Sequence, residues 1–170
     1  MSGAVQGNQS PIDIDTHAAP AVGVPELHFA PTAYRLDGTH YMPAIDQNWI
    51  VLDGATYRLI QMHFHRPSEH YLDGHQFAGE MHIVCQSDDG ETAVVGVLLS
   101  RADGVIDLAA TPVSLAAVVP SGRVFRYDGS LTTPPFTEGI KWVVYETPVD
   151  LPWACVSTGA RPLQQNGPRD

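Results

Sequence analysis

Three histidines in this chain have the residue type and the spacing of a zinc site. His63 and His65 lie two residues apart in the run 60–65, and His82 lies in a second run, 79–84. Side chains alternate between the two faces of an extended strand, so His63 and His65 share a face. If the two runs pair as neighbouring strands, all three imidazoles meet. A catalytic zinc ion takes three protein ligands and keeps a fourth position for water, so the pattern predicts a site of that kind.

Two polar residues are placed to orient these histidines. Gln61 lies two positions before His63, and Glu80 lies two positions before His82, so each shares the face of its histidine. Ligating imidazoles usually donate their second N–H to a carboxylate or a carbonyl, and these two residues supply such acceptors. The alternative is a set of hydrogen-bonded or surface histidines without metal, because short motifs of this kind also arise by chance.

Other candidates lie in predicted loops. Glu69 follows a proline and is either a solvated carboxylate or, if buried, a charge that needs hydrogen-bond donors. The segment 130–135 combines three hydroxyls with two prolines, so it is rigid, and a threonine such as Thr132 could accept one hydrogen bond and donate another. His40 suits a proton relay because an imidazole titrates near a pKa of about 6.5, although simple exposure explains it too. The other histidines are expected to be structural or solvent-facing, namely His17, His28, His70 and His75.

The first two histidines belong to a predicted hairpin. The runs 49–52 and 57–65 are joined by Asp-Gly at 53–54, which is a strong signal for a two-residue hairpin turn. Alternation then predicts that one face of the second strand carries the histidines while the other faces the core. The predicted core residues of that strand are Ile60, Met62 and Phe64.

Turn-forming residues are frequent throughout, with 15 glycines and 14 prolines separated by short β-like runs. This composition predicts a mostly β protein. The almost unbroken apolar run 93–99 predicts a central strand buried on both faces. Residues 104–119 are the best helical candidates, but Pro112 limits them to one or two turns.

Length and charge bound the class of protein. A chain of 170 residues is long enough for one domain with its own core and too short for two comfortable ones. With 44% hydrophobic residues and a formal charge of −10, it is predicted to be globular and to have no nucleic-acid partner. No apolar run approaches the roughly 18 residues of a membrane span, and the N-terminus lacks the pattern of a signal peptide. We therefore expect no membrane partner and a cytoplasmic location for the chain as it stands, or a periplasmic or secreted one if a signal peptide was removed.

Cysteine usage and the N-terminus add two smaller expectations. Cys85 and Cys155 cannot form a disulfide framework, and whether they pair with each other stays open. Cys85 falls on the core side of its strand, which favours a buried free thiol. Residues 1–8 are small and polar and are expected to fray.

Several separated motifs together resemble the α-class carbonic anhydrases, in a compact, bacterial-like form shortened at the N-terminus and in loops. The matching segments run in order along nearly the whole chain, and they are 9–14, 57–65, 67–70, 80–84, 129–135 and 161–164. Each segment is a weak signal alone, but the ordered combination is specific. The resemblance implies a single domain over residues 1–170, built around a large, mostly antiparallel twisted sheet with few short helices.

Carried onto this sequence, the resemblance implies that His63, His65 and His82 bind Zn²⁺, oriented by Gln61 and Glu80. The implied reaction is the reversible hydration of CO2 to bicarbonate by a zinc-bound hydroxide, since zinc lowers the pKa of its bound water, a behaviour for which this family is the standard example. CO2 and bicarbonate are then the small-molecule partners, and a homodimer stays open.

The resemblance also implies roles for the loop residues. Thr132 would accept a hydrogen bond from the hydroxide and donate its own to Glu69, and His40 would shuttle the proton. The implied CO2 pocket is lined by Val84, Val94, Leu131, Thr133 and Trp142. From the residues alone, core packing explains most of this apolar wall equally well.

Two alternatives remain at the level of sequence. A carbonic-anhydrase-like protein that has lost catalysis would serve as a binding module, although such proteins typically lack a ligand histidine and all three are present here. A cupin-type metalloprotein is the second, because His63, His65 and Glu69 match part of that family's first motif. Glu69 would then be a ligand, and a site of histidines plus carboxylate suits iron or manganese better than zinc.

Overall fold

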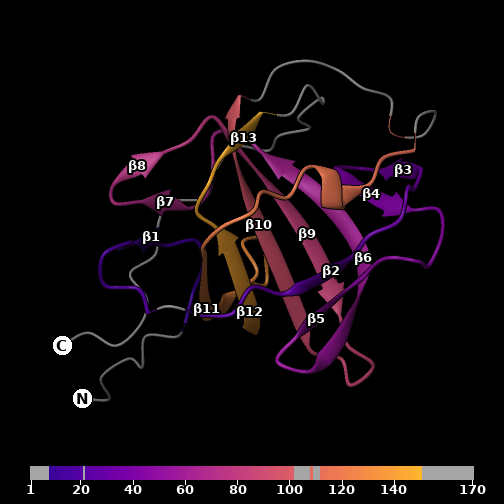
Figure 1. The fold of residues 1–170 in the computed structure, drawn as a ribbon, viewed down its shortest axis with the longest axis horizontal. Helices are drawn as coiled ribbons and strands as arrows, with labels where there is room; N and C mark the ends of the chain where they lie inside the picture. Colours follow the sequence, from indigo (N-terminus) through magenta and orange to yellow (C-terminus); the bar gives the residue numbers. More distant parts are fainter. Residues whose placement is uncertain (1–7, 21, 102–107, 109–111, 151–170) are drawn as a thin grey trace.

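The computed structural model describes residues 8–20, 22–101, 108 and 112–150, and strands dominate them (Figure 1). The one helix among these residues is a short 3-10 helix, Leu115–Ala117, inside the region where one or two helical turns were predicted. The predicted mainly β fold is therefore confirmed. No helix in the described part of the chain is long and apolar enough to cross a bilayer. Residues 1–7, which are expected to fray, lie outside the described residues. So does Cys155, so the question of its pairing with Cys85 is not addressed by the structure.

Ten strands form one large curled sheet. Its main path runs β11-β12-β10-β9-β6-β4-β3, with β13 beside β10 and with β5 joining β2 to β6. Most neighbours are antiparallel, as predicted, whereas β10 pairs in parallel with β12 and β13. The strands are β2 (Glu26–His28), β3 (Tyr34–Asp37), β4 (His40–Pro43), β5 (Trp49–Leu52), β6 (Ala55–His65), β9 (Gly79–Gln86), β10 (Thr92–Arg101), β11 (Val124–Ser130), β12 (Glu138–Tyr145) and β13 (Val149–Asp150).

A small second sheet lies to one side of the large one (Figure 1). It consists of β1 (Asp13–Ile14), β7 (Tyr71–Leu72) and β8 (His75–Gln76), in the order β1-β7-β8. Because β1 pairs in parallel with β7, the N-terminal segment is held against the chain that directly follows Glu69. This sheet therefore ties residues near the start of the chain to the loop after the first two histidines.

The predicted hairpin is confirmed. Strands β5 and β6 are antiparallel neighbours, and Leu52 pairs with Ala55 across the turn. Asp53 and Gly54 both have positive φ, 51° and 78°, which is the requirement of the two-residue turn that Asp-Gly favours. The turn thus sets the register from which the histidines of β6 are positioned.

A β-bulge in β6 overturns one prediction. Leu59 pairs with Cys85 and Gln61 pairs with Val84, so Ile60 is an extra residue without a partner position on β9. Ile60 is 38% exposed, and the prediction that it faces the core is wrong. The bulge shifts the alternation by one residue, because Leu59 before it and Met62 after it are both buried in the core. His63 and His65 consequently point away from that core.

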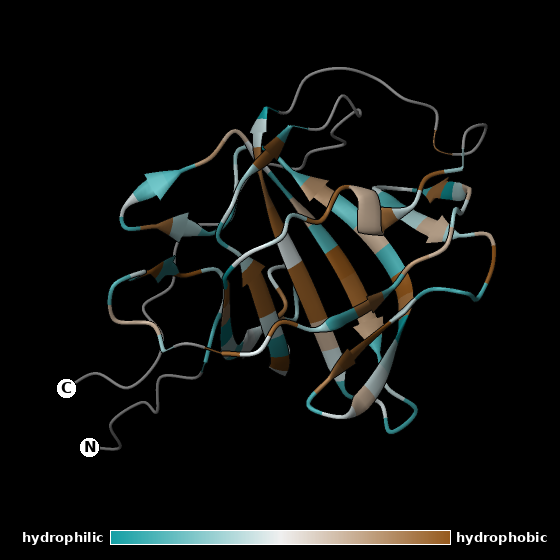
Figure 2. Ribbon diagram, viewed as in Figure 1, coloured by the Kyte–Doolittle hydropathy of each residue, from teal (hydrophilic) through white to brown (hydrophobic). Residues whose placement is uncertain are grey.

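The large sheet carries a hydrophobic cluster on each face, and Figure 2 shows hydrophobic residues concentrated on its central strands. Strand β10 contributes alternately to both clusters and is buried on both faces, as predicted. One face holds Met62, Phe64 and Met81. The other holds Val84 and Trp142, and it is this second face on which the histidines lie.

The bulge makes a testable distinction between neighbouring residues of β6. Met62→Ala should lower the free energy of unfolding by about 2–5 kcal/mol, because Met62 is fully buried. Ile60→Ala should lower it by less than about 1 kcal/mol, because the side chain already meets solvent. Urea titrations of the two variants, with unchanged m-values, measure both effects. Equal losses would place Ile60 in the core and contradict the bulge.

Candidate metal centre

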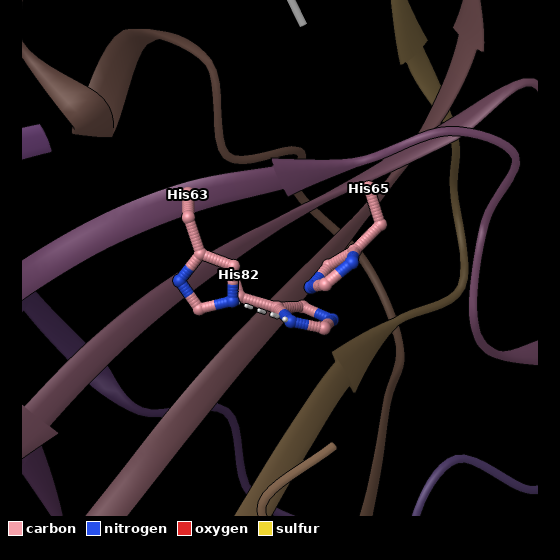
Figure 3. A group of neighbouring side chains, drawn as sticks. All are labelled: His63, His65 and His82. Carbon is pink, nitrogen blue, oxygen red and sulfur yellow. Dashed lines mark hydrogen bonds between the residues drawn. The ribbon is translucent and has the colours of Figure 1, made fainter. Parts of the chain in front are cut away.

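Three imidazole rings meet on the face of the sheet opposite the larger core. His63 on β6 lies directly across from His82 on β9, and His65 follows two residues later on the same face. The ring centroids lie 5.0 Å apart for His63 and His65, 5.1 Å for His63 and His82, and 4.6 Å for His65 and His82. One ring nitrogen from each lies within 4.8 Å of the others, and the rings face one another (Figure 3). The group can hold one divalent metal ion.

Hydrogen bonds on the outer side of two rings fix which nitrogens point inward. The Nδ1 of His63 lies 2.8 Å from Oε1 of Gln61 and donates to it, which leaves Nε2 facing the group. The Nε2 of His82 lies 2.6 Å from Oε2 of Glu80, so its Nδ1 faces inward. These are the two acceptors that the sequence placed beside the histidines.

The inward nitrogens have the separation that a metal needs. Nε2 of His63 and Nδ1 of His82 are 3.3 Å apart. A tetrahedral zinc ion with Zn–N bonds of about 2.0–2.1 Å places two nitrogen ligands about 3.3 Å apart. Two neutral rings whose other nitrogens donate outward would face each other with lone pairs, so a proton or a cation must lie between them. The donor set therefore fits zinc.

The protonation tendencies of the two rings differ. Burial, together with the neighbouring His82, His65 and His40, lowers the pKa of His63 to about 2, so this ring stays neutral. For His82, burial alone would lower the pKa, but the carboxylates of Glu80 and Glu69 outweigh it and raise the pKa above its ordinary value. Of the two rings, His82 therefore binds a proton more readily than His63.

Glu80 is the buried anion on which this arrangement rests. Its side chain is 0% exposed, and it receives four hydrogen bonds. Oε2 accepts from His82 at 2.6 Å and from Nδ1 of His70 at 2.7 Å, while Oε1 accepts the backbone N–H groups of Glu69 and His70 at 3.0 and 2.8 Å. Burial alone would raise the pKa of this carboxyl, but His70 and His82 hold it well below its usual range. A carboxylate has about four lone-pair sites, and here all of them are used.

The space for this carboxylate depends on a glycine. Gly96 on β10 pairs with His82, and a Cβ at this position would lie 3.1 Å from Oε2 of Glu80 and 3.5 Å from Val144. The contact with Glu80 is too close for an alanine unless the carboxylate shifts by a few tenths of an ångström, whereas the contact with Val144 is an ordinary van der Waals distance. The glycine within the apolar run 93–99 therefore serves the polar site rather than a turn.

His70 is a member of the site that sequence reasoning missed. From the sequence, His70 is expected to be structural or solvent-facing, and in the structure it is fully buried. Its ring lies between Glu80 and the hydroxyl of Tyr127, 2.6 Å from Nε2. The group of His70, Glu80 and His82 could also bind a metal by distance alone, but hydrogen bonds to the shared Oε2 already account for its short contacts. No spacing rule identifies His70, because it follows a loop rather than a strand.

Glu69 and Thr132 are not joined in this structure. Oε1 of Glu69 lies 3.1 Å from Nε2 of His65 and 3.8 Å from Nδ1 of His82, and the carboxylate is buried. Thr132 is half-buried and lines the same pocket as the histidines. Within the part of the chain that the structure describes, no hydrogen bond links the two side chains.

The predicted apolar residues line one pocket with His63 and His82. This cavity of about 170 Å3 is lined by His40, Gln61, His63, His82, Val84, Val94, Leu131, Thr132, Thr133 and Trp142. A larger hollow of about 540 Å3 lies elsewhere, between Ile14 and Phe125, and no histidine lines it. The smaller cavity is therefore the candidate site.

His40 lies at the mouth of this pocket. It begins β4, whose next residue, Tyr41, pairs with Met62 of β6, and its side chain is exposed. Its ring centroid is 5.1 Å from that of His63. The structure thus places His40 between the histidine group and solvent.

Comparisons with known proteins agree with this geometry. The family model described as eukaryotic-type carbonic anhydrase matches residues 2–110 and 100–168. The carbonic anhydrase of Pectobacterium carotovorum is 38% identical over 120 residues, which are 60% of this chain and 49% of the relative. Among solved structures, the α-carbonic anhydrase of Photobacterium profundum has a TM-score of 0.80 and 31% identity, covering 95% of this chain and 87% of the other. That of Thermovibrio ammonificans, in complex with the inhibitor sulfanilamide, has a TM-score of 0.77 and 26% identity over 92% and 84%.

The fold and the three-histidine group define a β-sheet protein with a candidate site for a single metal ion. The chain belongs to the eukaryotic-type, or α-class, carbonic anhydrase family. It spans about half the length of the Pectobacterium carotovorum relative and of a second curated carbonic anhydrase, at 49% of each. This membership leaves the cupin-type interpretation without support.

Metal affinity should depend on pH through His82. Its Nδ1 must lose a proton before it can bind a metal, and its pKa lies above the ordinary 6.5. Zinc affinity should therefore fall about tenfold for each pH unit below that pKa. Competition with a chromophoric chelator between about pH 5 and pH 9, corrected for the protonation of the chelator, measures this dependence. An affinity that does not change over this range would contradict the assignment of His82 as a ligand.

Glu80→Gln should weaken zinc binding by about 10- to 100-fold, because the amide cannot accept from His70 and His82 as the carboxylate does. Glu91→Gln is the matched control, since Glu91 is exposed and accepts a hydrogen bond from the hydroxyl of Tyr57, far along the sheet. The control should leave zinc affinity unchanged. Chelator competition measures the zinc affinity of both variants. A wild-type affinity in Glu80→Gln would show that the carboxylate does not orient His82.

Proposed function

We propose that this protein is a zinc-dependent carbonic anhydrase, which catalyses the reversible hydration of CO2 to bicarbonate and a proton. The observation that carries the proposal is the 3.3 Å separation of the inward nitrogens of His63 and His82, in a pocket whose opposite wall is apolar. Family membership supports it, because the sequence relatives are named carbonic anhydrases.

His63, His65 and His82 would hold the ion. Zinc bound by three imidazoles lowers the pKa of a water molecule in its remaining position and so supplies a nucleophile at neutral pH. Gln61 and Glu80 keep the lone pairs of their histidines directed inward, which fixes the geometry before the ion arrives.

The apolar wall suits CO2 and disfavours its product. CO2 is neutral and has no hydrogen-bond donor, so the side chains of Val84, Val94 and Leu131 can accept it without a desolvation cost. The indole N–H of Trp142 donates to the backbone oxygen of Ser130 at 2.9 Å, so the ring offers only its apolar surface to the pocket. Bicarbonate is charged, so it binds less well against this wall and leaves.

Thr132 would orient the nucleophile with the help of Glu69. Oε1 of Glu69 lies 3.1 Å from Nε2 of His65, at the histidine group. The hydroxyl of Thr132 would donate to the carboxylate of Glu69. A threonine that donates to a carboxylate presents only lone pairs to the pocket, so it accepts a hydrogen bond from the nucleophile and directs its oxygen at CO2.

His40 is the proposed proton acceptor. The reaction adds the oxygen of a water molecule to the carbon of CO2, and one proton of that water must leave the pocket. His40 is exposed at the mouth, with its ring 5.1 Å from that of His63, so it can receive the proton through water and release it to solvent.

Two substitutions separate metal binding from catalysis. His82→Ala should lose zinc and activity together, because it removes a ligand. Thr132→Ala should keep stoichiometric zinc and lose at least about 100-fold in kcat, because only the orientation of the nucleophile is lost. Metal analysis and a stopped-flow pH-indicator assay on the same samples measure both properties. Thr137→Ala, an exposed threonine of the same loop, should match the wild type.

Several outcomes would contradict the proposal. Full CO2 hydration after chelation would exclude a metal-dependent reaction, and a zinc-loaded wild type without activity would favour the non-catalytic binding protein. Iron or manganese in place of zinc would reopen the assignment of the site. Sulfanilamide, which occupies the Thermovibrio ammonificans structure as an inhibitor, should inhibit this protein if the pocket is the active site.

A further inference from the structure

The N-terminal motif Gln9-Ser10-Pro11 has no part in the proposed mechanism, yet it contacts the loop that carries Thr132. The backbone N–H of Ser10 donates to Oγ of Ser130 at 2.8 Å, and the backbone N–H of Ser130 donates to Oγ of Ser10 at 3.0 Å. Both serines are fully buried. This reciprocal pair holds the chain two residues before Thr132.

A second contact holds the other end of the same loop. The side-chain amide of Gln9 donates to the backbone oxygen of Phe136 at 3.1 Å, and the backbone N–H of Asn8 donates to the carboxylate of Glu138. Phe136 has a φ of 58°, a conformation that a non-glycine residue rarely adopts. The hydrogen bond from Gln9 therefore holds the loop where its backbone is least relaxed.

Ser10 is also joined to the histidine group. The hydroxyl of Tyr127 donates to Oγ of Ser10 at 2.7 Å and lies 2.6 Å from Nε2 of His70. His70 and His82 both donate to Oε2 of Glu80. A continuous set of buried contacts thus leads from the N-terminal segment to a predicted metal ligand.

We propose that Gln9 and Ser10 are positioning residues, which fix the loop 130–138 so that Thr132 keeps one place relative to His82. Across the described residues, no hydrogen bond of the Thr132 side chain is found, so its place depends on the backbone of its loop. Within this loop, the backbone N–H of Leu131 donates to the backbone oxygen of Thr137 at 2.9 Å and that of Phe136 donates to the backbone oxygen of Thr133 at 2.8 Å. Both ends are held by the N-terminal segment, and two prolines stiffen the chain between them. The catalytic consequence rests on the proposed function of Thr132, whereas the ordering of the loop does not.

Gly129 offers an independent way to disturb the same contact. A Cβ at this position would lie 2.1 Å from Oγ of Ser10 and 2.7 Å from the ring of Tyr127. Gly129→Ala must therefore displace the Ser10 hydroxyl and the ring of Tyr127, and it also meets Trp142 at 3.0 Å, whereas Ser10→Ala removes the hydroxyl alone. Because both changes break the contact made by the Ser10 hydroxyl, their effects in the double variant should be less than multiplicative.

The test compares zinc-loaded variants in two measurements. In Ser10→Ala, amide hydrogen exchange should rise within residues 130–138, zinc content should stay stoichiometric, and kcat should fall about 10- to 100-fold. Ser114→Ala is the control, because its hydroxyl makes a hydrogen bond away from the site, to the backbone oxygen of Phe29. It should change neither the exchange of the loop nor kcat. Gln9→Ala should raise exchange at the Phe136 end and is the second variant if Ser10→Ala does not fold.

Each outcome decides the proposal. Unchanged exchange in residues 130–138 of a folded variant would overturn the positioning role, and so would raised exchange with wild-type kcat. A lower melting temperature alone, without a local change in exchange, would mean that Ser10 serves stability only and would also overturn it. A zinc-loaded wild type that does not hydrate CO2 would instead refute the proposed function, and the exchange data would still test the ordering of the loop.

Discussion

One buried carboxylate, that of Glu80, organises the candidate metal centre. An unpaired charge in this fully buried position would be very costly, and the cost is offset only when all four of its hydrogen-bond donors are in place. Two of those donors are rings from different segments, His70 and His82, and the other two are backbone groups of the loop after β6. The carboxylate therefore ties the loop that carries Glu69 to the strand that carries His82.

The neighbouring strands explain how such a charge is accommodated. Gly96 on β10 leaves room beside Oε2 of Glu80, and Trp142 on β12 covers the rings of His70 and His82 at centroid distances of 4.8 and 4.9 Å. Strand β10 lies next to β9, and β12 lies next to β10, in the inner part of the sheet, where backbone motion is most restricted. A polar group of this kind is thus held on a rigid surface, which is what a site with narrow geometric tolerance requires.

The pocket is divided by chemistry. Histidines and Gln61 line the side formed by β4, β6 and β9, together with Val84. The side formed by β10, β12 and the loop 130–138 is apolar apart from its threonines. The division follows from the way the sheet is packed, because the same face carries a hydrophobic cluster of Val84, Val94 and Trp142. A small apolar substrate can therefore rest against the wall of a core while a polar reagent is held opposite it.

Sequence alone determined the features that depend on local periodicity. Alternation placed His63 and His65 on one face with Gln61, and the apolar run of β10 identified a strand buried on both faces, because both follow from backbone geometry over a few residues. Tertiary structure decided whatever depends on distant partners. Ile60 is exposed because the pairing of β6 with β9 contains a bulge at this residue. His70 belongs to the site because its ring contacts Glu80 and Tyr127. The hydroxyls of Ser10 and Tyr127 meet across 117 residues, a contact that no local pattern encodes.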